Sequence, residues 1–256
     1  MNPLMPALFL GHGSPMNAIE DNVFSRSWQA LGSSLPRPRA ILCISAHWET
    51  LGVSVTASDS PDTIHDFYGF PKTLFDVQYR APGNRELAQK IVDLLQPEIV
   101  HLDTERGLDH GAWSVLQPMY SAADIPVLQL SLDRTRNAQS HYALAKKLRP
   151  LREQGILIVG SGNIVHNLRV FDFNETRAYD WANAFDQTVM NCISQKDHAA
   201  LCDYSKFGPM AALSIPTAEH YLPLLYVLAQ QQDNESLKFF NEEVMSSISM
   251  RSLRIG

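Results

Sequence analysis

The chain has 256 residues, of which 45% are hydrophobic and 19% charged, as is usual in a soluble globular protein. That length accommodates one large α/β domain or two small ones. A formal net charge of −6 and a pI near 5.8 give no indication of a basic surface for nucleic acid or an anionic membrane. No stretch approaches the roughly 18 consecutive apolar residues of a transmembrane helix. We therefore expect neither a nucleic-acid-binding protein nor a membrane protein.

The cysteines and the N-terminus indicate the cellular compartment. Cys43, Cys192 and Cys202 are odd in number and have no close spacing, which predicts reduced thiols and no disulfide framework. The first apolar run follows no basic region, so no signal peptide is expected. Both features favour a cytoplasmic protein.

The N-terminal part of the chain alternates apolar runs with a helical pattern. Residues 7–10 and 40–45 are short apolar runs bounded by Gly, Pro or Ser, which is typical of buried strands. Between them, residues 23–31 carry apolar side chains at helical spacing. Residues 53–57 predict a third strand.

The central part begins with a segment of unusual composition. Residues 59–70 are rich in turn residues and aromatics, which predicts a long loop folded over a functional site. Residues 76–79 are expected to add a short strand. The apolar spacing predicts helices over 83–95 and 113–120, and a strand over 126–132.

The C-terminal part continues the alternation. Helices are predicted over 140–149, 179–194 and 218–228, and a core strand over 156–159. Strands that alternate with helices indicate an α/β fold. We expect one domain over residues 1–256, with a largely parallel or mixed central sheet flanked by helices.

Four histidines lie at or just past the end of an apolar run: His12, His47, His166 and His220. Open α/β sheets bind their ligands beyond the carboxyl ends of the strands. Imidazole is the commonest metal ligand in proteins, and its pKa lies near neutrality. The pattern therefore predicts an enzyme with a metal site and an acid/base partner at the rim of strand ends.

Several of these histidines also have a purely structural interpretation. His12 could lie exposed in a tight turn between two glycines, and His47 could be a rim residue bonded to a backbone carbonyl. His110 could be a solvated residue of a polar turn. Three further histidines lie among polar residues and are expected at the surface: His101, His141 and His198.

The segment before the last predicted helix leaves one question open. Thr217 reads as the cap of that helix, so Glu219 and His220 would be adjacent helical residues. Adjacent helical side chains project about 100° apart, given roughly 3.6 residues per turn. Only one of the two is then expected to face a metal, and the sequence does not choose between them.

The common catalytic signatures do not account for this set of residues. Gly160-Ser161-Gly162 has neither the spacing of a phosphate-binding loop nor the Gly-x-Ser-x-Gly of a nucleophile elbow. A serine hydrolase is therefore disfavoured. The sequence contains neither Cys-x-x-Cys nor His-Glu-x-x-His, so a zinc ribbon or a zincin is not expected either.

Six short segments in order along the chain resemble the 4,5-DOPA extradiol dioxygenase family. This family belongs to the class III extradiol ring-cleavage dioxygenases, which are related to the β subunit of protocatechuate 4,5-dioxygenase. The resemblance runs from Leu8 to about Arg254. Its segments are Gly-His-Gly-Ser-Pro at 11–15, Ser-Ala-His-Trp-Glu at 45–49, Asp-Phe-Tyr-Gly-Phe-Pro at 66–71, Leu-Asp-His-Gly-Ala-Trp at 108–113, Asn-Ile-Val-His-Asn at 163–167 and Ala-Glu-His-Tyr-Leu-Pro at 218–223.

The resemblance implies a non-haem metal centre. His12 and His47 match two histidine ligands of an Fe(II) site, and His220 matches the third position. Where the protocatechuate enzymes use a glutamate, the DOPA-type branch uses this histidine. Three imidazoles with an open position also suit catalytic Zn(II). His166 matches an acid/base histidine close to the metal, where it is also a candidate fourth ligand.

The resemblance also implies a catechol substrate and O2 as partners. His110 matches a loop histidine that is expected to contact the substrate. The chain is expected to act as a monomer. Two alternatives stay open, a zinc-dependent hydrolase and a non-enzymatic binding protein on the same fold. The residues expected to line the substrate pocket are His65, Phe67, Tyr68 and Trp113.

Overall fold

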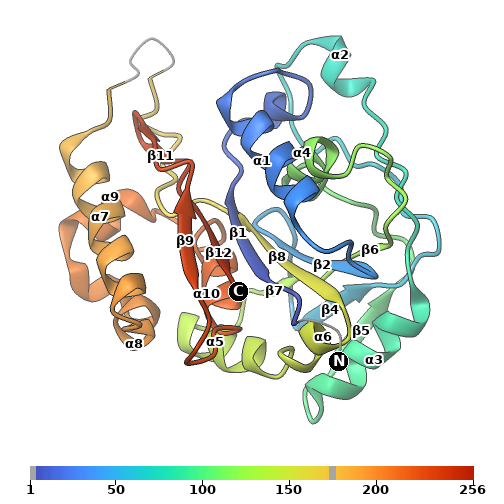
Figure 1. Ribbon diagram of the computed structural model, residues 1–256. Helices are drawn as coiled ribbons and strands as arrows, with labels where there is room; N and C mark the ends of the chain where they lie inside the picture. Colours follow the sequence, from blue (N-terminus) through green and yellow to red (C-terminus); the bar gives the residue numbers. More distant parts are fainter. Residues whose placement is uncertain (1–3, 173–176) are drawn as a thin grey trace.

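The computed structural model describes residues 4–172 and 177–256, and a six-stranded mixed sheet forms its centre (Figure 1). The strand order is β6-β2-β8-β1-β12-β9. The predicted α/β fold with a mixed sheet flanked by helices is confirmed. The strands are β1 (Ala7–Gly11), β2 (Ala40–Ser45), β6 (Val127–Gln129), β8 (Ile156–Gly162), β9 (Leu237–Phe240) and β12 (Ser252–Ile255).

The direction of the strands brings distant segments to one edge of the sheet. β8 pairs in parallel with both β1 and β2, and β2 pairs in parallel with β6. The carboxyl ends of these four strands therefore meet at the same edge. β12 runs antiparallel beside β1, and β9 runs antiparallel beside β12 at the other edge of the sheet.

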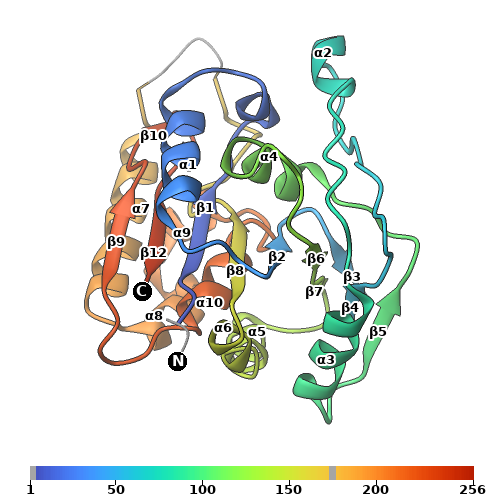
Figure 2. The same ribbon diagram turned by 45° about the vertical axis from the view of Figure 1, so that its right-hand side comes forward.

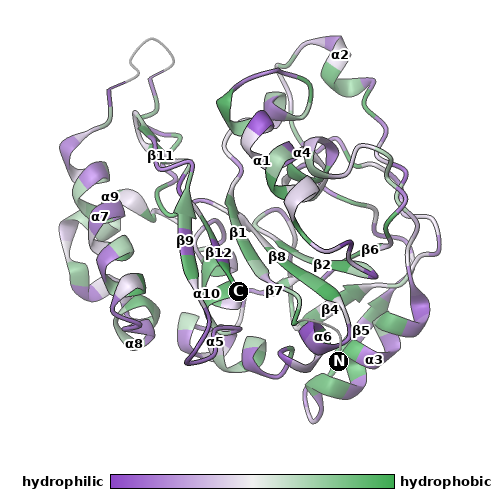
Figure 3. Cartoon of the chain, in the orientation of Figure 1, coloured by the Kyte–Doolittle hydropathy of each residue, from purple (hydrophilic) through white to green (hydrophobic). Residues whose placement is uncertain are grey.

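Alternate side chains of the strands supply two separate hydrophobic cores. On β1, Leu8 and Leu10 face a core that includes Trp28 of α1 (Val23–Ser34) and Trp113 of α4 (His110–Met119). Ala7 and its alternate neighbours face the opposite core, which includes buried side chains of α10 (Leu222–Leu228). This period-2 alternation explains why both faces of the sheet are covered by helices (Figure 2). Figure 3 shows the apolar strands between more polar helices.

The remaining elements surround this sheet. Three pairs of short strands form small sheets of their own: β3 (Glu49–Thr50) with β7 (Leu132–Asp133), β4 (Val53–Thr56) with β5 (Val100–Asp103), and β10 (Val244–Met245) with β11 (Ile248–Ser249). The helices are η1 (Pro15–Ala18), α1 (Val23–Ser34), α2 (Lys72–Phe75), α3 (Arg85–Leu95), α4 (His110–Met119), α5 (Ala138–Lys146), α6 (Pro150–Glu153), α7 (Asp180–Ser194), α8 (His198–Cys202), η2 (Tyr204–Phe207), α9 (Pro209–Ser214) and α10 (Leu222–Leu228).

Several predicted elements differ from the structure, among them the strand expected over 126–132, which is interrupted between β6 and β7. Residues 76–79 are not a strand, because the backbone N–H of Tyr79 donates to the Thr63 hydroxyl and not to a neighbouring strand. The helix expected over 113–120 begins at His110, because Asp109 caps it. The helix expected over 218–228 begins only at Leu222, because residues 217–221 form bends and turns and Thr217 is not its cap.

The antiparallel strands near the C-terminus were missed by the sequence analysis. β9, β10 and β11 are only partly apolar or very short, and β12 follows a polar stretch. Their pairing with β1 and with each other is a tertiary effect that periodicity within such short runs does not reveal. The strand predicted over 53–57 exists as β4, but it pairs with β5 outside the central sheet.

Two expectations for the whole chain concern its cysteines and its apolar helices. All three cysteines, which lie in the described part of the chain, are free, as predicted. Among residues 4–172 and 177–256, no helix is both long and apolar enough to cross a membrane.

A buried ion pair fastens the C-terminal strands to α7. The Arg251 side chain is 1% exposed, and it donates through Nε and Nη2 to Oδ2 of Asp186, which is fully buried. Oδ1 of Asp186 accepts a hydrogen bond from the Ser249 hydroxyl at 2.7 Å. Every oxygen of this buried carboxylate therefore has a partner.

We expect Arg251→Met to lower the free energy of unfolding by about 3–5 kcal/mol, because it leaves the Asp186 carboxylate buried without its cation. Urea denaturation measures the change. The double variant with Asp186→Leu should recover part of the loss, since neither charge then remains buried. A loss below about 1 kcal/mol, the value of an exposed pair, would contradict this account.

Candidate metal centre

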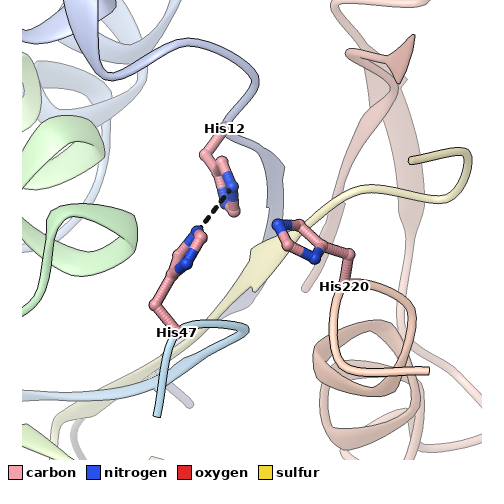
Figure 4. Close-up of side chains that lie close together, drawn as sticks. All are labelled: His12, His47 and His220. Carbon is pink, nitrogen blue, oxygen red and sulfur yellow. Dashed lines mark hydrogen bonds between the residues drawn. The ribbon is translucent and has the colours of Figure 1, made fainter. Parts of the chain in front are cut away.

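Three histidines reach one point from three different parts of the chain (Figure 4). His12 follows the last residue of β1, and His47 lies two residues beyond β2. His220 lies in the turn before α10, where its carbonyl accepts a hydrogen bond from the backbone N–H of Asn163 at 2.8 Å. Gly162 is needed at this crossing, because a Cβ there would overlap the His220 carbonyl.

The three rings converge at a separation that suits a shared ion. The ring centroids are 5.1 Å apart for His12 and His47, 5.3 Å for His12 and His220, and 5.0 Å for His47 and His220. One nitrogen from each ring lies within 4.8 Å of the other two. Such a trio of imidazoles is a known ligand set for a catalytic metal with an open position.

The hydrogen bonding of these rings is incomplete at their centre. Nε2 of His220 is buried and has no hydrogen-bond partner among the described residues. Nε2 of His12 faces Nε2 of His47 at 3.3 Å, so these two nitrogens share at most one proton between them. Buried polar atoms without partners are costly. A cation at this point would satisfy all three nitrogens, so the residues present fit a metal.

Burial keeps the same histidines neutral. Desolvation, and then the charge of the neighbouring histidines, lowers the pKa of His12 and of His220 well below the usual value. Desolvation, followed by the charge of His110, lowers the pKa of His47 to about 4. Neutral imidazole is the form that binds metal ions.

His166 lies directly beside this trio. Its ring stacks on that of His220 with 3.4 Å between centroids and 6° between planes. The backbone N–H of His166 donates to the Ser214 carbonyl, which fixes the loop after β8. Burial, and then the charge of His47, lowers the pKa of His166 to about 4. A neutral imidazole in this place can accept a proton.

His110 borders the trio on another side. Its ring centroid is 3.8 Å from that of His47, and its Nδ1 lies 2.9 Å from Oδ1 of Asp66. Burial works to raise the pKa of Asp66, but the hydrogen bonds and charge of His110 outweigh it and lower that pKa to about 2. The ionised Asp66 therefore holds the His110 ring in place. His110 was expected on a loop, but it is the first residue of α4.

The rings of His65, Phe67 and Trp113 form an aromatic wall beside His110. Phe67 makes ring contacts with His110 at 5.5 Å, His65 at 5.8 Å and Trp113 at 5.9 Å. The indole of Trp113 donates to the Ile64 carbonyl, so this wall is anchored. Tyr68 is 92% exposed and has no ring contact within the described residues, so the structure does not place it in the wall. The segment over 59–70 thus lies against the site, as expected.

Glu219 and His220 both belong to this region. Nδ1 of His220 lies 3.0 Å from Oε1 of Glu219, which also accepts a hydrogen bond from the Thr217 hydroxyl at 2.8 Å. Their expected separation by about 100° assumed a helix, and the turn found here removes that constraint. The carboxylate is positioned to orient the imidazole that faces His12 and His47.

A buried polar network that was not predicted from the sequence lies beneath His47. Asp109 is fully buried and accepts hydrogen bonds from the Ser45 hydroxyl at 2.6 Å and from the Gln129 amide at 2.7 Å. Arg106 donates through Nη2 to both Asp109 and the carbonyl of His47. One feature of the sequence could have indicated Asp109. It lies three residues before Ala112, and the side chain of an N-cap residue accepts a hydrogen bond from the backbone N–H at that spacing.

One of the other histidines is not at the surface. His141 is fully buried, and its Nδ1 lies 2.9 Å from the hydroxyl of Tyr226. Its polar neighbours in the sequence suggested exposure, but its position on the inner face of α5 against α10 decides otherwise. It does not take part in the histidine trio.

The fold and the histidine site define a non-haem metal enzyme. The sequence matches the family described as "Catalytic LigB subunit of aromatic ring-opening dioxygenase" over residues 6–250. The chain belongs to this family. It is an extradiol ring-cleaving dioxygenase, an oxidoreductase that acts with O2 on a small aromatic molecule, and the predictions of family and activity are confirmed.

Individual relatives agree with this assignment. A protein of Escherichia coli strain K12 named "4,5-DOPA dioxygenase extradiol" is 49% identical over 98% of this chain and 95% of its own. A protein of Beta vulgaris with the same name is 39% identical over 91% of this chain and 89% of its own. A crystal structure of an uncharacterized Escherichia coli K12 protein superposes with a TM-score of 0.87 at 45% identity, covering 98% of this chain and 100% of that chain.

Proposed function

We propose that the protein opens the ring of a catechol such as DOPA by 4,5-extradiol cleavage with O2. The observation that carries the proposal is the convergence of three imidazoles, two buried and one half-buried, beside an aromatic wall. The names of the relatives support DOPA as the substrate to test first. A planar catechol needs both a cation for its oxygens and an apolar surface for its ring, and the imidazole trio that could hold such a cation lies beside the aromatic wall.

His12, His47 and His220 would hold the metal, which we propose to be Fe(II). When bound, Fe(II) would supply a Lewis acid for the two catechol oxygens and a route for electrons between ring and O2. Zn(II) would also suit three imidazoles, but it is not redox-active and would not support this oxidation. The neutral state of the three rings favours binding of either ion.

His166 is the proposed acid/base residue. It is neutral near pH 7 because burial lowers its pKa to about 4, so it can take a proton from a catechol hydroxyl and later return it. Its ring stacks on that of His220, so the proton transfer would take place next to the proposed metal ligands. His110, held by Asp66, would orient the substrate from its place beside His47.

The aromatic wall is proposed to hold the substrate ring. Phe67→Ala should therefore raise the KM for DOPA about 10-fold with a smaller change in kcat, because the loss of a buried aromatic contact is worth roughly 1–2 kcal/mol. Steady-state oxygen uptake measures both constants. Tyr68→Ala is the matched control, since its 92% exposed ring lies outside the wall. Equal effects of the two substitutions would contradict this role of Phe67.

The proposed reaction is tested by reconstitution of the metal-free protein under anaerobic conditions. Fe(II) and, in parallel, Zn(II) are added, and oxygen uptake is then followed with DOPA and with simpler catechols. Stoichiometric oxygen loss and a yellow ring-opened product with iron alone are expected. Metal binding without oxygen uptake on any catechol would refute the proposal and favour a zinc-dependent hydrolase.

Two further parts of the proposal concern the whole protein. We propose that the protein is a monomer, and light scattering coupled to size exclusion chromatography tests this. We also propose a cytoplasmic location, which the free thiols of Cys43, Cys192 and Cys202 support. Fractionation of cells that produce the protein tests the location.

A further inference from the structure

The Gly-Ser-Gly segment at the end of β8 contains a serine whose role neither a phosphate loop nor a nucleophile elbow explains. Ser161 is fully buried in the middle of the sheet, between β1 and β2. It pairs in register with Leu10 on one side and with Ser45 on the other. Its hydroxyl therefore lies close to the strand ends that carry His12 and His47.

The Ser161 hydroxyl has two polar neighbours, but it has a single proton and can donate it to only one of them. Oγ lies 2.5 Å from the carbonyl of Gly111, which has no proton to give. Oγ also lies 3.0 Å from Nδ1 of His12. A hydroxyl has one proton to donate and two lone pairs. Since that proton goes to Gly111, Ser161 must accept from His12, and Nδ1 of His12 must carry the proton.

We infer that Ser161 is a positioning residue, which holds His12 as its Nδ1–H tautomer and so leaves the Nε2 lone pair free for the metal. The inference rests on the proposed metal site, but it concerns a residue outside the ligand trio. Loss of this acceptor would let Nδ1 and Nε2 of His12 compete for the proton, and the ring would lose its fixed orientation. Partners that orient ligand histidines in this way affect metal affinity.

The same hydroxyl joins two parts of the site. Gly111 is the second residue of α4, directly after His110. A Cβ at Gly111 would overlap the Ser45 hydroxyl and press on the His47 ring, so the first turn of α4 lies against the histidine trio without space between them. Ser161 thus ties the ring of His12 to the helix that carries His110.

Zinc affinity of the full-length, metal-free protein tests the inference. We expect Ser161→Ala to weaken Zn(II) binding by about 10- to 100-fold, as measured by competition with a chromophoric chelator. Ser131→Ala is the matched control, because Ser131 is also fully buried and loses bonds to Thr50 and Ser54, but none to a histidine. A Ser161→Ala protein that binds zinc within about 2-fold of the unsubstituted protein would overturn the inference.

A second measurement uses the unsubstituted protein and does not depend on the folding of any variant. Nitrogen-15 NMR of labelled histidines reports which ring nitrogen carries the proton. We expect Nδ1 of His12 to be protonated and Nε2 bare in the metal-free state, and the opposite tautomer would overturn the inference. Neither measurement requires turnover, so zinc binding that depends on Ser161 would stand even if no catechol supported oxygen uptake.

Discussion

His47→Ala should lose bound metal and ring-opening activity together. His47 supplies one of the three converging nitrogens, and the two that remain leave the ion without a stable ligand set. We expect metal affinity to fall by more than about 100-fold, which exceeds the effect typical of a residue that only supports a ligand. Elemental analysis of the purified variant and oxygen uptake after addition of Fe(II) measure the two losses.

A control variant shows whether the removal of any histidine, inside or outside the trio, has the same effect. His101→Ala removes an exposed imidazole from β5, outside the trio, and should retain both metal and turnover. Circular dichroism and urea denaturation show whether His47→Ala remains folded. Full metal occupancy with unchanged turnover in His47→Ala would remove this residue from the metal site.

His166→Ala should keep at least part of its metal and lose most of its turnover. The ring stacks on His220 but lies outside the His12, His47 and His220 group whose nitrogens converge. General acid/base residues contribute about 100- to 10,000-fold to rate, so kcat is expected to fall within that range. Single-turnover measurements with the iron-loaded variant show whether the chemical step is the one affected.

The outcome for His166 distinguishes two roles that its position permits. Loss of the metal in step with activity would make it a ligand, together with the nearby Glu219 and His220. An unchanged rate would exclude the acid/base role. Retained metal with a slow chemical step is the result that the proposed mechanism requires.

The sequence was sufficient for the parallel half of the fold. The runs that became β1, β2 and β8 are continuous and apolar because both faces of each strand are buried. The antiparallel half was not predictable in the same way, since β9 and β12 are short and depend on their pairing with each other and with β1. The start of α10 was misplaced because a cap-like threonine precedes a turn rather than the helix itself.

The histidines of the candidate site could be predicted for a similar reason. His12 and His47 follow the ends of parallel strands, and such ends meet at one edge of the sheet. The partners of these rings could not be predicted, because Asp66 and Ser161 reach His110 and His12 across large separations in sequence. These contacts form only once the sheet and α4 are assembled.

The order in which the chain is made has a consequence for the metal centre. β1 is synthesised first, yet it lies between β8 and β12 in the finished sheet, and β12 comes from the last residues of the chain. His12 must likewise wait for His220 before the trio is complete. A chain that has not yet reached His220 therefore lacks the complete trio, and the edges of β1 are unpaired until β8 and β12 have been made. Uptake of the proposed metal would then be a late event that stabilises only chains in which His12 and His220 have come together, since an ion that binds the native state stabilises that state alone.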